Sequence, residues 1–478
     1  MSKKHNMKKL LYTLILILLM CFPALSQDIE RIQEKANAID EYISAQANLG
    51  RFNGSVLVAK GDQILVRKGF GYAEFDNLIP FTPKTKQVVA SISKMFTAFA
   101  ALQLQEAGKL NLTNSICNYL DGCPEAWQPI IIENLIHHTS GIPDYEEELK
   151  LGSAEYIEFM TKPNSSERIV EQAKLKPLDF APGEKFRYSN TAYIVLSYII
   201  EQASAKPFEK YIQEHIFKPA GMKNSGVLGS NKMPKNIASG YTQRDLTWDE
   251  FLGGHPIKKS EIKKMPVLPK SSPAGDAFMY STLDDLYRWS RIMGGKSKLA
   301  SRENINKIFG KSEKADYGYG WFTGKGFDRK RARHNGQLPG YMTEFVRFPE
   351  EDITIIIFSN VETRMMGRIT RDISAIVLGT PWDMPVSGNV FELNEEHISR
   401  LLGKYKMADG KILTISKGKD YLMANLQDFY TAGLIPLSPT EFYFPLADGR
   451  AIFTLDDDGQ VVKVNMRYSG EDHIAERL

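Results

Sequence analysis

The stretch Ala90–Leu110, with the sequence ASISKMFTAFAALQLQEAGKL, decides how the rest of the chain is interpreted. Its apolar residues recur at helical spacing up to Gly108, a residue type typical of helix ends, so the stretch predicts a helix. Ser91 stands three residues before Lys94, and positions i and i+3 of a helix share one face. Ser91 is therefore either a cap at the helix start or a hydroxyl activated by a neighbouring amine.

The spacing of Ser91 and Lys94 does not identify a nucleophile by itself. Serine precedes lysine by three residues at two further places, 260/263 and 416/419. At least two of these three pairs are coincidences, so the surrounding sequence has to decide.

The segments on both sides of the stretch predict an α+β fold. Residues Gly54–Glu74 contain two β-branched runs around a Gly-Asp turn, which predicts a hairpin. A mostly helical region extends to about Arg291, and the runs GYGWFT, RARHNG, GYMTEFVRFP and ITIIIFSN then predict strands between Gly318 and Asn360, followed by a helix over 363–378. We therefore expect one antiparallel sheet built from both ends of residues 27–380 and flanked by helices. A helical subdomain is inserted, and a cleft lies where the Ser91 helix meets the late strands.

The C-terminal part predicts a separate small β module. Residues 381–390 are rich in turn-forming residues and read as a linker, and 391–478 contain short strand-like runs. Asp-Gly pairs at Asp409, Asp448 and Asp458 predict hairpin turns, so we expect an all-β barrel or sandwich. This module either covers the active site, binds substrate or stabilises the chain.

The N-terminus has the pattern of an export signal. Four lysines precede an uncharged apolar run at 10–22 that is short for a membrane span, and Ala24 and Ser26 are small. We expect cleavage after Ser26 (signal peptide 1–26) and a periplasmic or secreted protein. A lipid anchor on Cys21 or a retained anchor helix is the alternative contact with a membrane. Removal of the signal peptide takes away four lysines and no acidic residue, so the net charge changes from +3 to −1. A charge so close to zero does not indicate nucleic-acid binding.

The remaining cysteines, Cys117 and Cys123, either form a small-loop disulfide in an oxidising compartment or stay free. No paired Cys or His lies nearby at metal-ligand spacing, so we expect no metal and no cofactor. The lysine-rich run at 257–264 reads as a solvated loop.

Three further motifs stand at informative places: HHTSGIPDY (His137–Tyr145), APGEKFRYSNTAY with Tyr188-Ser189-Asn190, and RARHNGQLPGY with His334-Asn335-Gly336. Together with Ser-x-Ser-Lys at 91–94, and in this order, they resemble the serine β-lactamase and penicillin-binding-protein superfamily. The resemblance is to its class C β-lactamase, esterase and D-aminopeptidase branch, and it covers 39–378. It implies the β-lactamase/transpeptidase-like fold, with Ser91 as the nucleophile.

The resemblance assigns Lys94 and Tyr188 to proton transfer. A free lysine has a pKa of about 10.4, but burial and the positive end of a helix favour the neutral amine, which can act as a base. Tyr188 is expected to face the same hydroxyl and to relay the proton to the leaving group; its alternative role is that of a packed aromatic. Asn190 is expected to bind Lys94 or a substrate amide, or else to cap the following helix.

The resemblance also implies an oxyanion hole made by the backbone N–H groups of Ser91 and Gln337. Gly336 is expected to let an extended substrate approach the strand edge. His334 stands where many β-lactamases carry lysine, and histidine is largely neutral at pH 7. This weakens the case for a β-lactamase and favours ester or peptide substrates, with a structural histidine as the alternative.

Three other features have weaker assignments. His137 and His138 are expected to pack the loop rather than bind a metal. The aromatic residues of Tyr317–Phe322 form either a wall of the acyl pocket or ordinary core. The loop SPAGDAFMYST usually has two glycines in the family, whereas here Asp276 follows Gly275.

The sequence thus predicts an exported serine hydrolase that acts through an acyl-enzyme at Ser91. Its expected substrates are small esters, D-amino-acid or cell-wall-derived peptides, and β-lactams only as a weak activity. The alternative is a catalytically silent protein that holds cell-wall fragments on the same fold.

Overall fold

The computed structural model of the chain describes residues 30–147, 149, 153–228, 234–242, 262–266, 274–295, 299–310, 312–363, 365–388, 390–418, 422–427 and 430–478. The predicted signal peptide and most of the lysine-rich run at 257–264 lie outside these residues. In the described part of that run, Lys263–Lys264 form the short strand β8, and Lys264 pairs with Glu74 and Asp76 rather than standing free in a loop.

The predicted antiparallel sheet is confirmed, with the strand order β10-β11-β12-β13-β1-β2. The N-terminal hairpin contributes the two strands at one end of the sheet, and the late segments contribute the other four. Gly54 lies opposite Ser359, so the first strand pairs with the last. The bounds are β1 Gly54–Lys60, β2 Gln63–Phe70, β10 Phe322–Gly326, β11 Arg329–Leu338, β12 Tyr341–Phe348 and β13 Ile353–Ser359.

The predicted strand over GYGWFT is mostly wrong, because β10 begins only at Phe322. The residues before it form a turn in which Gly320 has φ +78, and a Cβ there would lie 2.7 Å from the Lys94 carbonyl oxygen. The turn therefore packs directly against the backbone of the helix that follows Ser91. A β-propensity pattern cannot show this contact.

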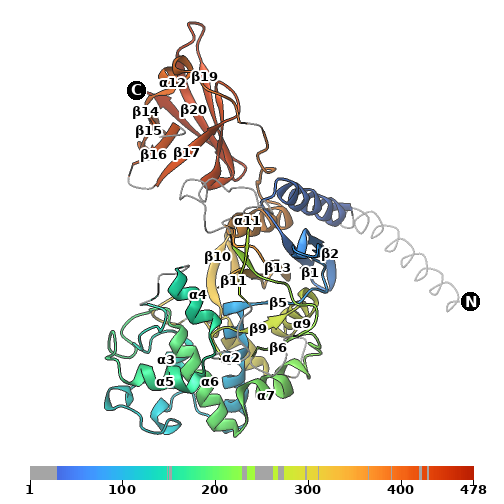
Figure 1. The fold of residues 1–478 in the computed structure, drawn as a ribbon, viewed down its shortest axis with the longest axis vertical. Coiled ribbons are helices and arrows are strands. Elements are labelled where there is room, and N and C mark those ends of the chain that lie inside the picture. The colour runs from blue at the N-terminus through green and yellow to red at the C-terminus, as the bar shows by residue number, and fades with distance from the viewer. Residues whose placement is uncertain are drawn as a thin grey trace, which may run out of the picture.

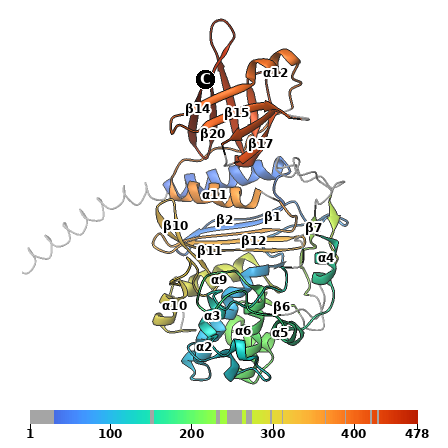
Figure 2. The ribbon, with the colours of Figure 1, turned by 90° about the vertical axis from the view of Figure 1, so that its left-hand side faces the viewer.

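One face of the sheet is covered by α11 (Met365–Leu378), which fulfils the predicted helix near 363–378, and by the helix over 30–48 (Figures 1 and 2). Side chains that alternate along the strands divide between two cores. Val56, Val58, Ile355 and Ile357 face these two helices. Their neighbours Leu57, Ile356 and Phe358 face the helical block on the other side.

The helical block packs on the opposite face, with α2 (Ser93–Glu106) at its centre (Figure 2). Almost all of α2 is buried, because other helices surround it, so the single apolar stripe expected from its sequence underestimates its burial. The other helices are α3 Ile132–Ile136, α4 Ala154–Thr161, α5 Ser166–Lys174, α6 Asn190–Ser204, α7 Phe208–Ile212, α9 Leu283–Met293 and α10 Arg302–Ile308.

The C-terminal module is a closed antiparallel barrel of β14–β21, which decides between the predicted barrel and sandwich. All three predicted Asp-Gly turns join consecutive strands. The bounds are β14 Gly403–Met407, β15 Ile412–Lys417, β16 Leu422–Leu426, β17 Tyr430–Pro436, β18 Glu441–Phe444, β19 Gly449–Leu455, β20 Val461–Tyr468 and β21 Glu471–Arg477, with α12 (Glu395–Leu401) before them.

The barrel sits beyond α11 and the 30–48 helix, across the sheet from α2 (Figures 1 and 2). Asp448 of the barrel is buried at this junction, where it accepts hydrogen bonds from Arg51 at 3.0 Å and from Gln46 at 2.9 Å. Arg51 also lies 4.5 Å above the Tyr443 ring. The barrel is thus attached through a buried charged contact and does not lie over the Ser91 side of the sheet.

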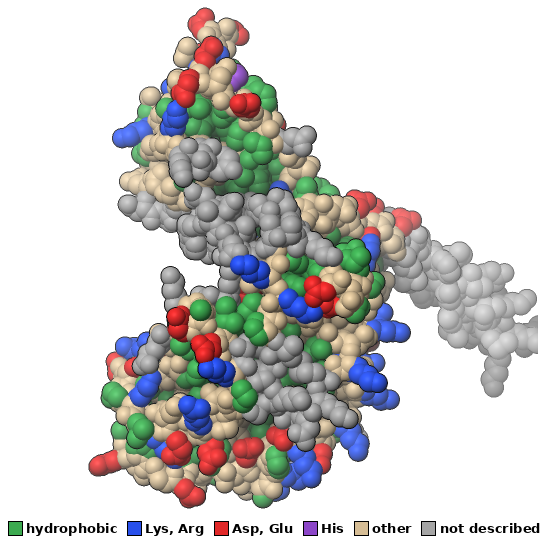
Figure 3. Space-filling model, viewed as in Figure 1, with side chains coloured by type: hydrophobic (Ala, Val, Ile, Leu, Met, Phe, Trp, Pro, Cys, Tyr) green, Lys and Arg blue, Asp and Glu red, His purple; other side chains and the backbone are tan. Residues whose placement is uncertain are grey.

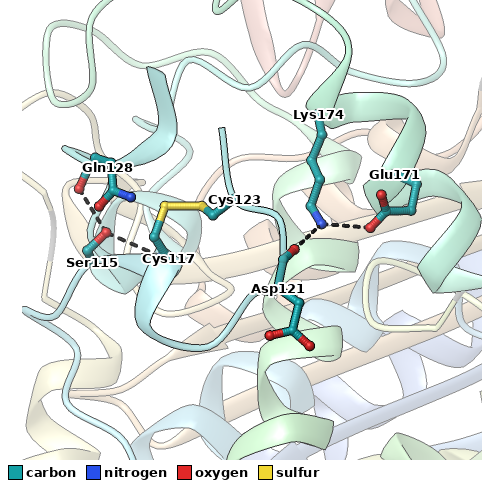
Figure 4. The surroundings of a disulfide bond; sticks show 7 residues. All are labelled: Ser115, Cys117, Asp121, Cys123, Gln128, Glu171 and Lys174. Carbon is teal, nitrogen blue, oxygen red and sulfur yellow. Dashed lines mark hydrogen bonds and ion pairs between the residues drawn. A yellow bond between two sulfur atoms is a disulfide. The ribbon is translucent and has the colours of Figure 1, made fainter. Parts of the chain in front are cut away.

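Cys117 and Cys123 form a disulfide beside α5 (Figure 4). Lys174 of α5 donates to the Asp121 carbonyl at 2.6 Å, inside the loop that the disulfide closes. The bond therefore restrains a short surface loop of the helical block. Over the face shown in Figure 3, acidic and basic side chains are interspersed on this block. Within the described residues, no helix has both the length and the apolar character needed to cross a membrane.

Candidate active site

Ser91 lies in a tight turn rather than inside α2. The 3₁₀ turn η1 (Ala90–Ile92) precedes the helix, and neither helical start has a side-chain cap hydrogen bond. Ala90 has φ +49, a left-handed conformation that costs a non-glycine residue roughly 1–2 kcal/mol. Ser91 is partly exposed while its neighbours in the turn are buried. Ser91 is therefore presented by a strained turn and does not act as the helix cap.

Lys94 is fully buried and its amine has three oxygen neighbours. Its Nζ lies 3.1 Å from Ser91 Oγ, 2.7 Å from Asn190 Oδ1 and 2.9 Å from the Asp276 carbonyl oxygen. The two carbonyl oxygens can only accept, so they take two N–H groups. The third position, toward Ser91, is then either a third N–H or the lone pair of a neutral amine. In the second case the amine can accept the serine proton.

Tyr188 completes the surroundings of the Ser91 hydroxyl. Lys94 Nζ lies 4.9 Å from the centre of its ring. Burial raises the pKa of the Tyr188 phenol, although the Lys94 charge and hydrogen bonds with Lys94 and Ser91 act in the opposite direction. The phenol therefore carries its proton at neutral pH and is able to give it to a leaving group.

Asn190 is held from two sides. Its amide oxygen accepts from Lys94, and its backbone N–H donates a short hydrogen bond to Asp144 Oδ2. The cap of α6 is Ser189, whose hydroxyl accepts from Ala192 N–H at 3.1 Å. Asn190 thus orients the lysine and does not cap the helix with its side chain.

His334 is a buried, neutral imidazole. Its Nδ1 lies 2.6 Å from the Asn335 carbonyl oxygen, which can only accept, so Nδ1 carries the proton. Its Nε2 lies 3.1 Å from the Tyr317 hydroxyl and accepts from it. Burial, with a smaller effect from Lys94, lowers the pKa of His334 to about 3. This position therefore offers no positive charge to a substrate carboxylate.

Gly336 brings β11 against the nucleophile turn. A Cβ at Gly336 would lie 2.2 Å from the Val89 carbonyl oxygen and 3.2 Å from Ser91 N. Glycine is therefore required by the approach of the chain itself, whereas the sequence suggested room for substrate. Gln337 follows in β11 with an exposed side chain, and the assignment of its N–H to an oxyanion hole stays a prediction.

The two histidines of the HHTSGIPDY motif pack within the protein. His138 stacks on Tyr188 with ring centres 4.2 Å apart and accepts from Ser189 N–H at 3.0 Å. His137 Nδ1 lies 3.1 Å from the Tyr317 carbonyl oxygen. Among the described residues no group of His, Cys, Asp and Glu side chains could hold a metal ion.

Sequence reasoning missed an acidic group behind Lys94. Asp144 receives the Asn190 N–H, and the Tyr145 hydroxyl donates to Asp276 Oδ2 at 3.1 Å. Burial raises the pKa of Glu146 to about 8. The signal was available in the quoted HHTSGIPDY motif, whose aspartate and tyrosine received no role.

Sequence comparisons relate the chain to known proteins. The family model described as Beta-lactamase matches residues 38–378. The chain is 28% identical to penicillin-binding protein 4* of Bacillus subtilis (strain 168) over 441 residues, which are 89% of this chain and 95% of that protein. It is 26% identical to protein flp of Staphylococcus aureus (strain MW2), covering 71% of this chain and 66% of that protein.

Solved structures show the same fold at lower identity. The octameric penicillin-binding protein homologue from Pyrococcus abyssi superposes with a TM-score of 0.64 at 22% identity and covers 92% of this chain and 99% of its own. The D-amino acid amidase from Ochrobactrum anthropi SV3, solved with D-phenylalanine, superposes with a TM-score of 0.61 at 20% identity and covers 73% and 99%. The chain described here belongs to the beta-lactamase family.

Proposed function

We propose that the protein is a serine hydrolase that forms an acyl-enzyme at Ser91. Its substrates are small esters or peptides, including D-amino-acid and cell-wall-derived ones, and its β-lactamase activity is weak or absent. The observation that supports this most directly is the buried Lys94 amine, which two carbonyl oxygens hold beside the Ser91 hydroxyl.

The contacts support a step in acyl transfer for each side chain. Ser91 Oγ attacks the substrate carbonyl carbon while the hydroxyl proton passes to the lone pair of the Lys94 amine, and the carbonyl electron pair moves onto oxygen. The bond to the leaving group then breaks as Tyr188 gives it a proton, and Tyr188 recovers a proton from Lys94. Water repeats the sequence on the acyl-enzyme and releases Ser91.

The substrate class follows from charge. A penicillin or a peptide C-terminus carries a carboxylate, which a permanent cation in β11 would bind. His334 is neutral because its pKa lies near 3. The site therefore favours substrates without a carboxylate next to the scissile bond, such as esters and amides. A D-amino acid amidase among the structural neighbours supports this choice.

Turnover by Ser91→Ala tests the proposal. A panel of p-nitrophenyl esters, D-Ala peptides and nitrocefin should identify the preferred substrate of the parent enzyme. Ser91→Ala should then lose at least about 1,000-fold in kcat, as is typical when a nucleophile is removed. Ser416→Ala is a matched control, because this exposed barrel serine has the same sequence spacing to a lysine and should leave turnover unchanged. Full activity in Ser91→Ala would refute the acyl-enzyme. Binding of cell-wall peptides without turnover in the parent would favour the silent binding protein.

We also propose that the protein is exported, on the basis of the pattern in residues 1–26. Expression with the full N-terminus and sequencing of the mature protein should give a chain that begins at Gln27. A mature chain that keeps residues 1–26 would contradict export, and one that begins at a lipid-modified Cys21 would contradict cleavage after Ser26.

A further inference from the structure

A cavity of about 430 Å³ lies in the helical block, where residues of α4, α5 and the start of α6 line it. Small-molecule sites in proteins typically measure about 300–1,000 Å³, so the volume suits a small ligand. Pro143 and Tyr145 form a further part of the wall. Ser91, Lys94 and Tyr188 are not among the lining residues, so this cavity is not the space in front of the nucleophile.

The walls of the cavity are mainly apolar. The rings of Tyr145 and Phe159 lie 5.5 Å apart and are tilted by 32°, and Ile169 and Ala173 of α5 are buried. Leu175 also lines the cavity although 87% of its surface is exposed, which places it at the rim. A molecule bound here would remove this apolar surface from water, at a gain of roughly 25 cal/mol per Å². The lining therefore favours a ligand with an apolar body.

Thr191 places one polar group inside the cavity. The residue is 0% exposed, and its Oγ1 accepts a hydrogen bond from the Tyr145 N–H at 2.8 Å. A hydroxyl also has one hydrogen to donate. Within the part of the chain that the structure describes, no acceptor takes the Thr191 hydrogen. Because an unsatisfied buried donor is unfavourable, an acceptor oxygen on a ligand would be stabilised at this place.

The charges around the cavity favour an uncharged ligand. Among the described residues that line it, Lys176 is the one that carries a charge, and it already interacts with another group of the chain. A charged ligand would therefore bring an uncompensated charge against apolar walls, which is unfavourable. Gln172 of α5 lines the cavity with an exposed side chain, whose amide can bond a polar but uncharged end of a ligand.

We propose that this cavity is a binding site for a small uncharged molecule that has an apolar body and a carbonyl or ether oxygen. The oxygen accepts from the Thr191 hydroxyl, and the apolar body packs on Tyr145, Phe159 and Leu175. The site goes beyond the proposed function, because it uses none of the side chains that carry out acyl transfer.

Binding of 6-propionyl-2-(dimethylamino)naphthalene tests the proposal, because this uncharged aromatic ketone emits at shorter wavelength when it leaves water. A fluorescence titration of the parent enzyme should show one saturable site per chain, and no saturable binding would overturn the proposal. Modification of Ser91 with a fluorophosphonate should leave the Kd unchanged. Loss of binding after this modification would place the ketone in front of Ser91 and would also overturn the proposal. A parent enzyme that the fluorophosphonate does not modify would refute the proposed function alone.

Substitutions locate the binding site. Leu175→Asp puts a charge at the exposed rim and should weaken binding at least about fivefold, because the leucine contact is lost. Leu478→Asp is the matched control, since Leu478 is 70% exposed at the end of the barrel, and it should leave the Kd unchanged. Equal Kd values for Leu175→Asp and the parent would overturn the proposed place.

The hydroxyl of Thr191 has its own pair of variants. Thr191→Val keeps the shape and should weaken binding about threefold to tenfold, as is typical for the loss of one neutral hydrogen bond, whereas Thr191→Ser keeps the hydroxyl and should bind like the parent. Unchanged binding in a folded Thr191→Val would contradict the hydrogen bond to the ligand. If Thr191→Val does not fold, as judged by circular dichroism, the result for Leu175→Asp decides.

Discussion

Replacing Gly336 by alanine should damage catalysis more than stability. The new Cβ would lie 2.2 Å from the Val89 carbonyl oxygen and 3.2 Å from Ser91 N, whereas real Cβ contacts essentially never fall below 3.0 Å. Both neighbours are backbone atoms and cannot rotate away. The distance to Val89 must therefore grow from 2.2 Å to at least 3.0 Å, by moving either β11 or the turn that carries Ser91.

The structure gives the size of the effect. A displacement approaching 1 Å at the reacting atoms costs on the order of 100-fold in rate. Overpacking by one methyl group costs typically about 1–3 kcal/mol of unfolding free energy. We therefore expect Gly336→Ala to remain folded while its kcat falls about 100-fold on the preferred substrate. The assay is kcat and KM at saturating substrate, together with urea unfolding followed by circular dichroism.

Gly367→Ala is the matched control. A Cβ at Gly367 meets nothing within 4 Å, and the residue is exposed on α11, remote from Ser91. This replacement should leave kcat unchanged and add up to about 1 kcal/mol of stability, because alanine is the better helix former. If Gly336→Ala keeps the parent's kcat, the close approach of β11 to the nucleophile turn does not matter for catalysis, and the reasoning is refuted.

Further outcomes test other parts of the molecule. Asp448→Asn should lower the unfolding free energy by about 3 kcal/mol by breaking a buried ion pair but leave turnover unchanged, because the barrel lies across the sheet from the site; a loss of kcat measured at saturating substrate would contradict this. His334→Lys should raise the rate of acylation by nitrocefin relative to esters, because it adds a cation for the carboxylate; an unchanged ratio would count against the charge argument. Replacing Cys117 and Cys123 by serine should lower the unfolding free energy by about 2 kcal/mol, because a short disulfide ring restricts the entropy of the unfolded chain. Urea unfolding under oxidising conditions measures this difference, and equal midpoints would show that the bond does not stabilise the fold. Burial raises the pKa of Glu146 to about 8, so its stabilising contribution is present below about pH 4.5 and lost as the pH rises through 8. Glu146→Gln should therefore gain stability over the parent at pH 8.5 but not at pH 4, and a pH-independent difference in melting temperature would disprove it.

Local patterns predicted the elements of the fold well. The alternation of β-branched residues in 54–74 specifies the hairpin, and its pairing with the late strands follows because an antiparallel sheet needs both. The Asp-Gly pairs mark barrel turns because they provide the backbone conformations that tight hairpins require. Closure of the barrel depends on the pairing of β14 with β21, which no local pattern encodes.

Contacts between segments that are distant in the chain could not be predicted from the sequence. The sequence around Gly320 has the pattern of a strand, and only the backbone of α2 packed beside it shows why the chain turns there. Asp144 and Asp276 lie far apart in sequence, and only the folded chain brings their carboxyl groups near enough to interact electrostatically. A motif can indicate a nucleophile and its lysine, but the charge balance around the lysine is a property of packing.

Covalent capture of the acyl-enzyme tests the central claim most directly. The parent enzyme is incubated with a fluorophosphonate and separately with a slowly hydrolysed ester, then analysed by intact-mass and peptide mass spectrometry. The account predicts one adduct per chain, located on the peptide that contains Ser91, and no adduct in Lys94→Met at neutral pH on the same time scale. An adduct on another residue, or none in the folded parent enzyme, would contradict it.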